Sequence, residues 1–247
     1  ESLTFYNPII KNKLNKINES LYKNKELSFS HSGHLGDLIY SLPLIKELSK
    51  KYTCNFFINI NKKNKIPYPN HPSSDVMLNE KIANLLLPLL KKQNFLNNAR
   101  ILEKEKIDID LDLFRDMPIN IHFHSVKWYS HLTGTPINMK DSYLNAKKKN
   151  GFENKITVAR SPRYRNQYIN YKFLKNITNI VCVGLKSEFE DLKKDIPNLE
   201  FHECRDFLEL AEIINSSRFF IGNQSFPFSI AEALKVPRLL EACPDFP

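Results

Sequence analysis

Short apolar runs alternate with apolar positions at helical spacing along most of this 247-residue chain. The first clear unit opens with a short strand pattern at 27–31 and a loop containing two glycines. From Asp37 to Leu48, apolar residues then recur at three- and four-residue spacing, which predicts a helix with one apolar face. A second apolar run follows at 54–60. Strand, glycine loop, helix and strand in this order open a βαβ unit, so we predict a parallel sheet.

The middle of the chain has a weaker pattern. Residues 61–75 are rich in Asn, Lys and Pro and predict a loop. Helical spacing returns at 76–90 and at 125–132, with no clear periodicity between these two segments. Residues 141–154 include consecutive lysines before Gly151 and predict a linker between two domains.

The second half has the most regular alternation. Apolar runs predict strands at 156–159, 180–183, 199–202, 218–221 and 238–240, and helical spacing predicts helices at 171–176, 187–194, 207–214 and 225–234. Strands that alternate with helices in this way are typical of an open doubly wound sheet. We therefore predict an α/β protein built from two Rossmann-type domains with parallel sheets.

The N-terminal domain is predicted at 1–148, with a Lys/Asn-rich leader at 1–26, and the C-terminal domain at 149–247. A hydrophobic fraction of 42% suffices for packed cores. No apolar run approaches the roughly 18 residues that a membrane-spanning helix needs. The leader lacks the apolar segment of a signal peptide. We therefore expect a cytoplasmic protein without a transmembrane segment; peripheral contact with a membrane stays open.

Charge, cysteine and histidine content argue against several functions. The net charge of +9 comes mostly from Lys mixed with Asn, which is typical of solvated surface, so no specific nucleic-acid partner is expected. None of the four cysteines forms a C-x-x-C pair, and reduced thiols are predicted. His122, His124 and His131 have no partner at ligand spacing, so no metal is expected.

The loop after the first predicted strand is the first candidate site, because ligands of open α/β sheets bind at the carboxyl ends of the strands. Two glycines would let the backbone approach a ligand closely. Asp37 is either the cap of the next helix or a carboxylate that takes a proton from a substrate hydroxyl. The spacing fits neither common nucleotide-binding glycine motif. The candidate ligand-contacting residues in this loop are Ser32, Gly33, His34 and Gly36. His31 and His34 flank Gly33 and are candidates for touching a substrate.

A second candidate segment follows the first strand of the C-terminal domain. Arg160, Arg163 and Arg165 would suit a diphosphate or a carboxylate through forked hydrogen bonds. The alternative is an exposed basic loop that pairs with acidic neighbours.

A third candidate segment, at 222–229, combines small and amide residues before a helix. One turn further, Glu232 is placed to meet a ribose hydroxyl, whereas ordinary helix capping by Ser225 is the alternative for this segment. The candidate ligand-binding residues here are Asn223, Gln224, Ser225, Ser229 and Glu232.

Three stretches resemble motifs of one enzyme family. The sequence GDLIYSLP at 36–43 resembles the N-terminal motif of heptosyltransferase-type (family 9) GT-B glycosyltransferases. Residues 219–237 resemble the second signature of this family, and the loop from Gly184 to Glu188 is similar to its acidic nucleotide contact. The combination of SGHLGD, SPRYRN and GNQSFPFS is most similar to a poorly characterised bacterial and phage branch.

This resemblance implies two Rossmann-like domains facing a cleft, with the acceptor on the first and a nucleotide-sugar mainly on the second. It implies a metal-independent, inverting glycosyltransferase with no cofactor and a glycan or lipid-linked acceptor. Asp37 matches the catalytic base, and Arg160 or Arg163 would neutralise the leaving diphosphate. A non-catalytic protein that binds nucleotides or carbohydrates on the same fold is the alternative.

Overall fold

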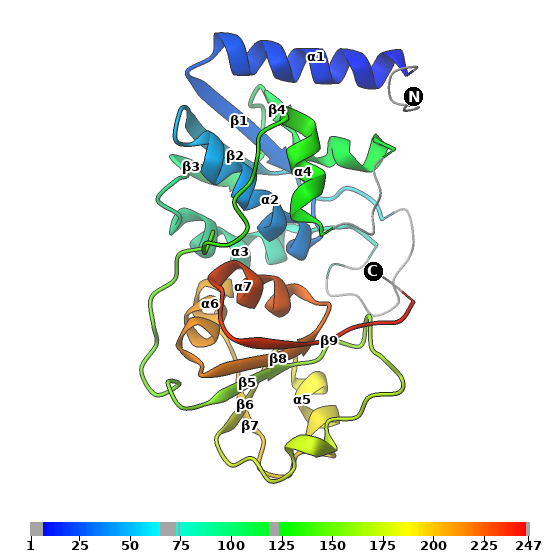
Figure 1. Ribbon diagram of the computed structural model, residues 1–247, viewed down its shortest axis with the longest axis vertical. Helices are drawn as coiled ribbons and strands as arrows, with labels where there is room; N and C mark the ends of the chain where they lie inside the picture. The colour runs from blue at the N-terminus through cyan, green and yellow to red at the C-terminus, as the bar shows by residue number, and fades with distance from the viewer. Residues whose placement is uncertain (1–6, 65–72, 74, 119–123, 246–247) are drawn as a thin grey trace. The chain divides into compact units, whose positions relative to one another are not determined.

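The computed structural model describes residues 7–64, 73, 75–118 and 124–245. The chain divides into two compact units, Glu1–Tyr143 and Leu144–Pro247. Each unit is built on its own parallel β-sheet with helices packed against it (Figure 1). Within the described residues, no helix is both long and apolar enough to cross a membrane.

The first unit contains a four-stranded parallel sheet with the strand order β3-β2-β1-β4. Its buried centre is β1 and β2, where Phe29 lies opposite Phe56 in the register. The predicted βαβ unit is confirmed, because α2 connects these two strands. The strands are β1 (Glu26–His31), β2 (Thr53–Ile58), β3 (Asn98–Ile101) and β4 (Ile109–Asp110), and the helices are α1 (Pro8–Lys23), α2 (Leu35–Leu48), α3 (Glu80–Lys91), the 3₁₀-helix η2 (Leu111–Asp116) and α4 (Val126–Thr133).

Most of the Lys/Asn-rich leader forms the helix α1. Asn7 caps this helix, because its side-chain Oδ1 accepts hydrogen bonds from the backbone N–H groups of Ile9 and Ile10 at 3.0 and 3.3 Å. The side chains of Ile10 and Ile17 are buried, and because these residues are seven positions apart they lie on the same face of the helix. The helix therefore packs by an apolar stripe. The sequence contains this stripe, but the intervening lysines and asparagines obscure it.

The segment between α3 and α4 holds elements for which the sequence shows no periodicity. The strands β3 and β4 and the helix η2 lie there, and each is short. Strands of two to four residues and a single 3₁₀ segment are too short to establish a period of their own. Part of the predicted loop at 61–75 and the residue His122 lie outside the described residues.

The second unit contains a five-stranded parallel sheet with the order β7-β6-β5-β8-β9. This order is the Rossmann pattern, with the first strand of the unit at the centre. The helices α6 and α7 cover one face of the sheet and α5 covers the other (Figure 1). The elements are β5 (Ile156–Ala159), the 3₁₀-helix η3 (Lys172–Leu174), β6 (Ile180–Val183), α5 (Lys186–Lys193), β7 (Glu200–His202), α6 (Phe207–Ser216), β8 (Phe219–Asn223), α7 (Phe226–Leu234) and β9 (Arg238–Glu241).

All five strands predicted for this unit are confirmed, and the doubly wound α/β fold is therefore confirmed as well. The predicted helix at 171–176 is shorter, a 3₁₀ turn. Asp206 caps α6 as the sequence indicates, since its Oδ1 accepts a hydrogen bond from the N–H of Glu209 at 2.8 Å.

Gly222 gives a direct test of how closely the central strands of this unit pack. A Cβ atom at this position would lie 2.6 Å from the carbonyl oxygen of Ala159 and 2.9 Å from the ring of Phe220. The carbonyl belongs to the neighbouring strand β5 and cannot rotate away. Gly222→Ala is therefore expected to lower the free energy of unfolding by about 1–3 kcal/mol, measured by denaturant titration. An unchanged midpoint would contradict this close approach.

Candidate functional site

Asp37 lies in the first turn of α2, the helix that follows the central strand β1. The cap of this helix is His34, not Asp37, and Gly36 lies inside the first turn, not in the preceding loop. Oδ2 of Asp37 accepts a hydrogen bond from the backbone N–H of His34 at 3.3 Å. A carboxylate at this position is favoured by the N-terminal end of the helix dipole.

Arg115 from η2 fixes the Asp37 side chain. Its Nη2 donates to Oδ2 of Asp37 at 2.7 Å and also to the carbonyl oxygen of Gly33, while its Nη1 donates to Asp112. The Asp112 side chain is 5% exposed and also accepts a hydrogen bond from Nζ of Lys62 at 3.1 Å. Sequence reasoning missed Arg115, Asp112 and Lys62.

A chain of hydrogen bonds runs underneath the glycine loop. Gly33 N–H donates to Nδ1 of His31 at 3.0 Å, so the proton of the neutral ring is on Nε2. That Nε2 lies 2.8 Å from the hydroxyl of Tyr129, which in turn donates to the carbonyl oxygen of Asp37 at 3.0 Å. His31 is fully buried, so it supports the loop from below and is not exposed to a ligand, contrary to the contact expected from its position in the sequence.

Ser32 and Gly33 both pack against Met77. Ser32 is fully buried and its hydroxyl lies 3.7 Å from the sulfur of Met77. Gly33 has φ +108°, a conformation that favours glycine, and a Cβ atom at this position would lie 3.3 Å from the carbonyl oxygen of Met77. The loop is therefore a fixed support for the first turn of α2.

Burial sets the protonation of this cluster. Removal from water lowers the pKa of His31 to about 4, although Asp112 acts in the opposite direction, and burial raises the pKa of Tyr129 well above its usual value. Burial would also raise the pKa of Asp112, but His31, Arg115, a hydrogen bond from Ser32, and Lys62 together outweigh burial, and the pKa is lowered. His31 and Tyr129 are therefore neutral near pH 7, whereas Asp112 is ionised.

The buried His31 predicts a pH dependence of stability. An unfolded chain binds a proton at His31 near pH 6.5, whereas the folded protein resists protonation down to about pH 4. The unfolded state therefore binds more protons between these values, and stability is lost as the pH falls from 6.5 to 4, by about 3 kcal/mol. His31→Gln should remove this part of the dependence. Denaturant titrations of both proteins at a series of pH values test it, and parallel curves would contradict it.

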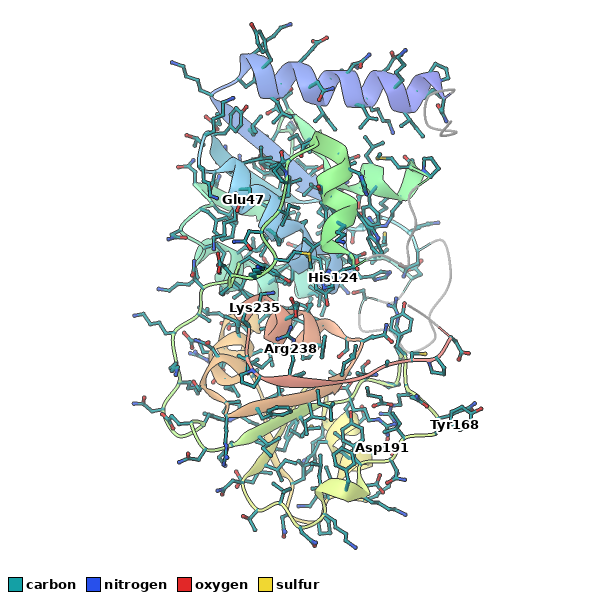
Figure 2. All side chains as sticks on the ribbon, in the orientation of Figure 1. Glu47, His124, Tyr168, Asp191, Lys235 and Arg238 are labelled. Carbon is teal, nitrogen blue, oxygen red and sulfur yellow. The ribbon has the colours of Figure 1, made fainter. Side chains whose placement is uncertain are left out.

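The three arginines of the loop after β5 differ in what they bind. Arg160 is buried and forms a forked ion pair with Glu241 at the end of β9, with N···O distances of 2.7 and 2.8 Å. Arg165 forms an ion pair with Asp191 of α5, a residue labelled in Figure 2. For both, the structure shows the pairing with acidic neighbours that the sequence left as the alternative. A role in phosphate binding stays a prediction.

Asn223 holds the arginine loop in place. Its amide accepts from Ser161 N–H at 3.1 Å and donates to the carbonyl oxygens of Ser161 and Arg163 at 3.0 and 2.7 Å. Arg163 stacks on the ring of Tyr164, with 4.5 Å between the guanidinium carbon and the ring centroid. Tyr164 has φ +58°, which is rare for a bulky residue and is found where surrounding contacts fix the backbone.

The remaining predicted donor-side residues lie at the carboxyl ends of β6 and β8. Gly184 has φ +132°, and Glu188 caps the first turn of α5 by accepting from Leu185 N–H at 2.9 Å. Burial raises the pKa of Glu188. Gln224 accepts a hydrogen bond from Cys243 N–H at 2.7 Å.

The predicted site residues of α7 and its N-cap form hydrogen bonds and ion pairs within the helix and with the segments next to it. The hydroxyl groups of Ser225 and Ser229 donate to backbone carbonyl oxygens nearby, of Asn223 and Phe226 respectively. Glu232 is 8% exposed and forms ion pairs with Lys235 and Arg238, both labelled in Figure 2. Its predicted contact with a ribose stays untested.

Among the residues that the structure describes, no group of three or more His, Cys, Asp or Glu side chains is placed to hold a metal ion. The arrangement that remains is a partly exposed carboxylate on a helix N-terminus in the first unit. In the second unit, the arginine loop held by Asn223 follows β5, and the N-termini of α5 and α7 follow β6 and β8.

No protein-family model and no curated protein matches the sequence. Similarity appears among solved structures. A glycosyl transferase family 9 protein from Veillonella parvula DSM 2008 is 11% identical over 87% of this chain and 80% of its own, with a TM-score of 0.55. The heptosyltransferase TibC of enterotoxigenic E. coli, solved with ADP-D-β-D-heptose, is 12% identical, covers 88% of this chain and 58% of its own, and has a TM-score of 0.57.

E. coli heptosyltransferase WaaC, solved with ADP-2-deoxy-2-fluoro heptose, is 11% identical over 87% of this chain and 88% of its own, with a TM-score of 0.50. Identity this low shows the fold alone. Together with the two parallel sheets, these similarities confirm the predicted GT-B-like α/β fold with two Rossmann-like units.

Proposed function

We propose that this protein is a glycosyltransferase that moves a sugar from a nucleotide-sugar donor to a hydroxyl group of a glycan or lipid-linked acceptor. The observation that carries the proposal is the state of Asp37: an oriented, partly exposed carboxylate at the start of α2, on a fold similar to that of known sugar transferases. Two of the similar structures were solved with ADP-heptose or an analogue, which supports a nucleotide-sugar as donor.

The two carboxylate oxygens of Asp37 differ in their hydrogen bonds. Oδ2 accepts from Arg115 and His34, whereas Oδ1 accepts no hydrogen bond from any described residue, and the side chain is 24% exposed. In the proposed reaction Oδ1 accepts the proton of the acceptor hydroxyl while the hydroxyl oxygen attacks the anomeric carbon. Attack opposite the leaving diphosphate inverts the configuration at that carbon.

The second unit is proposed to hold the donor. The N–H groups at the starts of α5 and α7 favour phosphate, and Arg163 on its clamped loop is the proposed partner of the leaving diphosphate. Arg160 is proposed to contribute by holding the loop rather than by direct contact, because Glu241 already occupies its fork. We propose that cationic side chains and helix N-termini, without a metal ion, stabilise the charge on the leaving group.

A thermal-shift screen tests the proposal. The free nucleoside diphosphates with adenine, uracil, guanine, cytosine and thymine bases, and their sugar derivatives including ADP-heptose, are added to the intact chain. A nucleotide at 100 times its dissociation constant stabilises by about 2.7 kcal/mol, which corresponds to a shift of several degrees.

A shift with one nucleotide identifies the donor class. Release of that nucleoside diphosphate from its sugar, dependent on an added acceptor, then tests transfer. No shift with any nucleotide would overturn the proposal, and a shift without transfer from any donor would favour the non-catalytic binding protein.

A further inference from the structure

The guanidinium of Arg115 joins acceptors from two separate segments of the first unit. It binds Asp37 and the Gly33 carbonyl oxygen on one side and Asp112 on the other. The side chain is 18% exposed and stacks on the ring of Phe114, with 4.5 Å between the guanidinium carbon and the ring centroid. A planar fork with fixed donor directions holds such acceptors in one geometry, which a flexible ammonium group does not.

Charged groups of both signs surround Asp37. The carboxylates of Asp37 and Asp112 face the cations of Arg115 and Lys62, and Asp112 takes hydrogen bonds from both cations. One guanidinium therefore binds both carboxylates, Asp37 through Nη2 and Asp112 through Nη1. The titratable groups packed around this turn come from several elements. They are Arg115 and Asp112 from η2, Asp110 at the end of β4, His31 from β1, Tyr129 from α4, Lys62 after β2, the cap residue His34, and His124, whose ring packs against Tyr40 of α2.

Resting on the proposed function, we infer that Arg115 is a positioning residue for Asp37, and that Asp112 keeps Asp37 basic by sharing the same guanidinium. Arg115 holds Oδ2 and thereby directs Oδ1 to the acceptor. A cation bound to Asp37 alone would stabilise the carboxylate and weaken it as a base. The buried Asp112 binds the same guanidinium, and its negative charge offsets part of the effect of the cation on Asp37. Arg115 can therefore orient the Asp37 carboxylate without fully neutralising it.

Two substitutions should therefore shift the acid limb of the pH–kcat profile in opposite directions. Arg115→Met removes a cation from Asp37 and moves the limb to higher pH. Asp112→Asn removes an anion and moves it to lower pH. We expect kcat to fall at least about tenfold in Arg115→Met, with the donor KM within about twofold of the original. Arg115→Lys should recover part of the loss.

The matched control is Arg100→Met, which removes another arginine of the first unit, one that pairs with Glu105 at 2.6 Å. It should leave kcat and the pH profile unchanged. If Asp112→Asn does not fold, Lys62→Met replaces it. The Lys62 side chain is 45% exposed, and its loss lets Asp112 draw more strongly on Arg115, so the acid limb should move to higher pH.

A carboxyl-carbon NMR titration of the ¹³C-Asp-labelled protein separates this inference from the proposed function. The Asp37 signal, assigned by its loss in Asp37→Asn, reports the pKa of Asp37 without turnover. Opposite shifts in Arg115→Met and Asp112→Asn, together with transfer activity, support the inference. Opposite shifts in a protein without transfer activity overturn the proposed function but leave the coupling of the three side chains standing. Active enzyme in which Arg115→Met and Asp112→Asn shift the signal in the same direction overturns the inference, and so does active enzyme in which Arg115→Met or the substitute Lys62→Met leaves it unshifted.

Discussion

Asp37→Asn is expected to reduce sugar transfer by about 10²–10⁴-fold while donor binding is retained. The amide keeps the volume of the carboxylate and accepts a hydrogen bond from Arg115 through its oxygen, so the first turn of α2 stays in place. It has no basic oxygen to take the proton of the acceptor hydroxyl. Initial rates of acceptor-dependent nucleoside diphosphate release measure the loss, and the thermal shift with the donor nucleotide measures binding.

Asp116→Asn is the matched control for this prediction. Asp116 ends η2 in the same unit, its side chain is 51% exposed, and it forms a surface ion pair with Lys13 at 3.5 Å. An exposed pair of this kind contributes little, so activity and stability should stay close to the original values. Transfer that survives Asp37→Asn at more than a tenth of the original rate would exclude Asp37 as the base.

The three central strands of the second unit, β5, β6 and β8, could be predicted because each is an apolar run that is largely buried. The edge strands β7 and β9 are short and partly exposed, and their positions follow from the regular alternation with helices. Ile180–Val183 is buried throughout, so its position is clear from composition alone. The strand ends in turn indicate where Asp37 and the arginine loop lie, because parallel sheets place their loops at one edge.

The partners of these side chains could not be predicted. Arg115 is 78 residues from Asp37, and Glu241 is 81 residues from Arg160, so no local spacing relates either pair. Arg115 also lies in a 3₁₀ segment that shows no helical period. The sequence identifies which residue types reach the strand ends, whereas their charge partners depend on tertiary packing. Three arginines at one strand end are therefore consistent with a phosphate-binding site and equally with arginines that form ion pairs inside the protein.

The ion pair of Arg160 with Glu241 carries the second large expected effect. The Glu241 side chain is 2% exposed, and its Oε1 also accepts a hydrogen bond from Asn166 N–H at 2.8 Å. Glu241→Gln leaves the guanidinium of Arg160 buried without a compensating charge. Breaking such a pair from one side is expected to lower the free energy of unfolding by about 3 kcal/mol, measured by denaturant titration.

Two further variants decide whether Arg160 holds the loop or binds phosphate directly. Asp191→Asn breaks the more exposed pair with Arg165 and should cost less than about 1 kcal/mol. The double variant Arg160→Met/Glu241→Leu replaces the buried pair by apolar groups of similar size and should recover most of the loss. If Glu241→Gln instead leaves stability unchanged, and Arg160→Met abolishes the thermal shift with nucleotide, Arg160 is a ligand-binding residue. Its pairing with Glu241 would then be a resting contact that the donor diphosphate displaces.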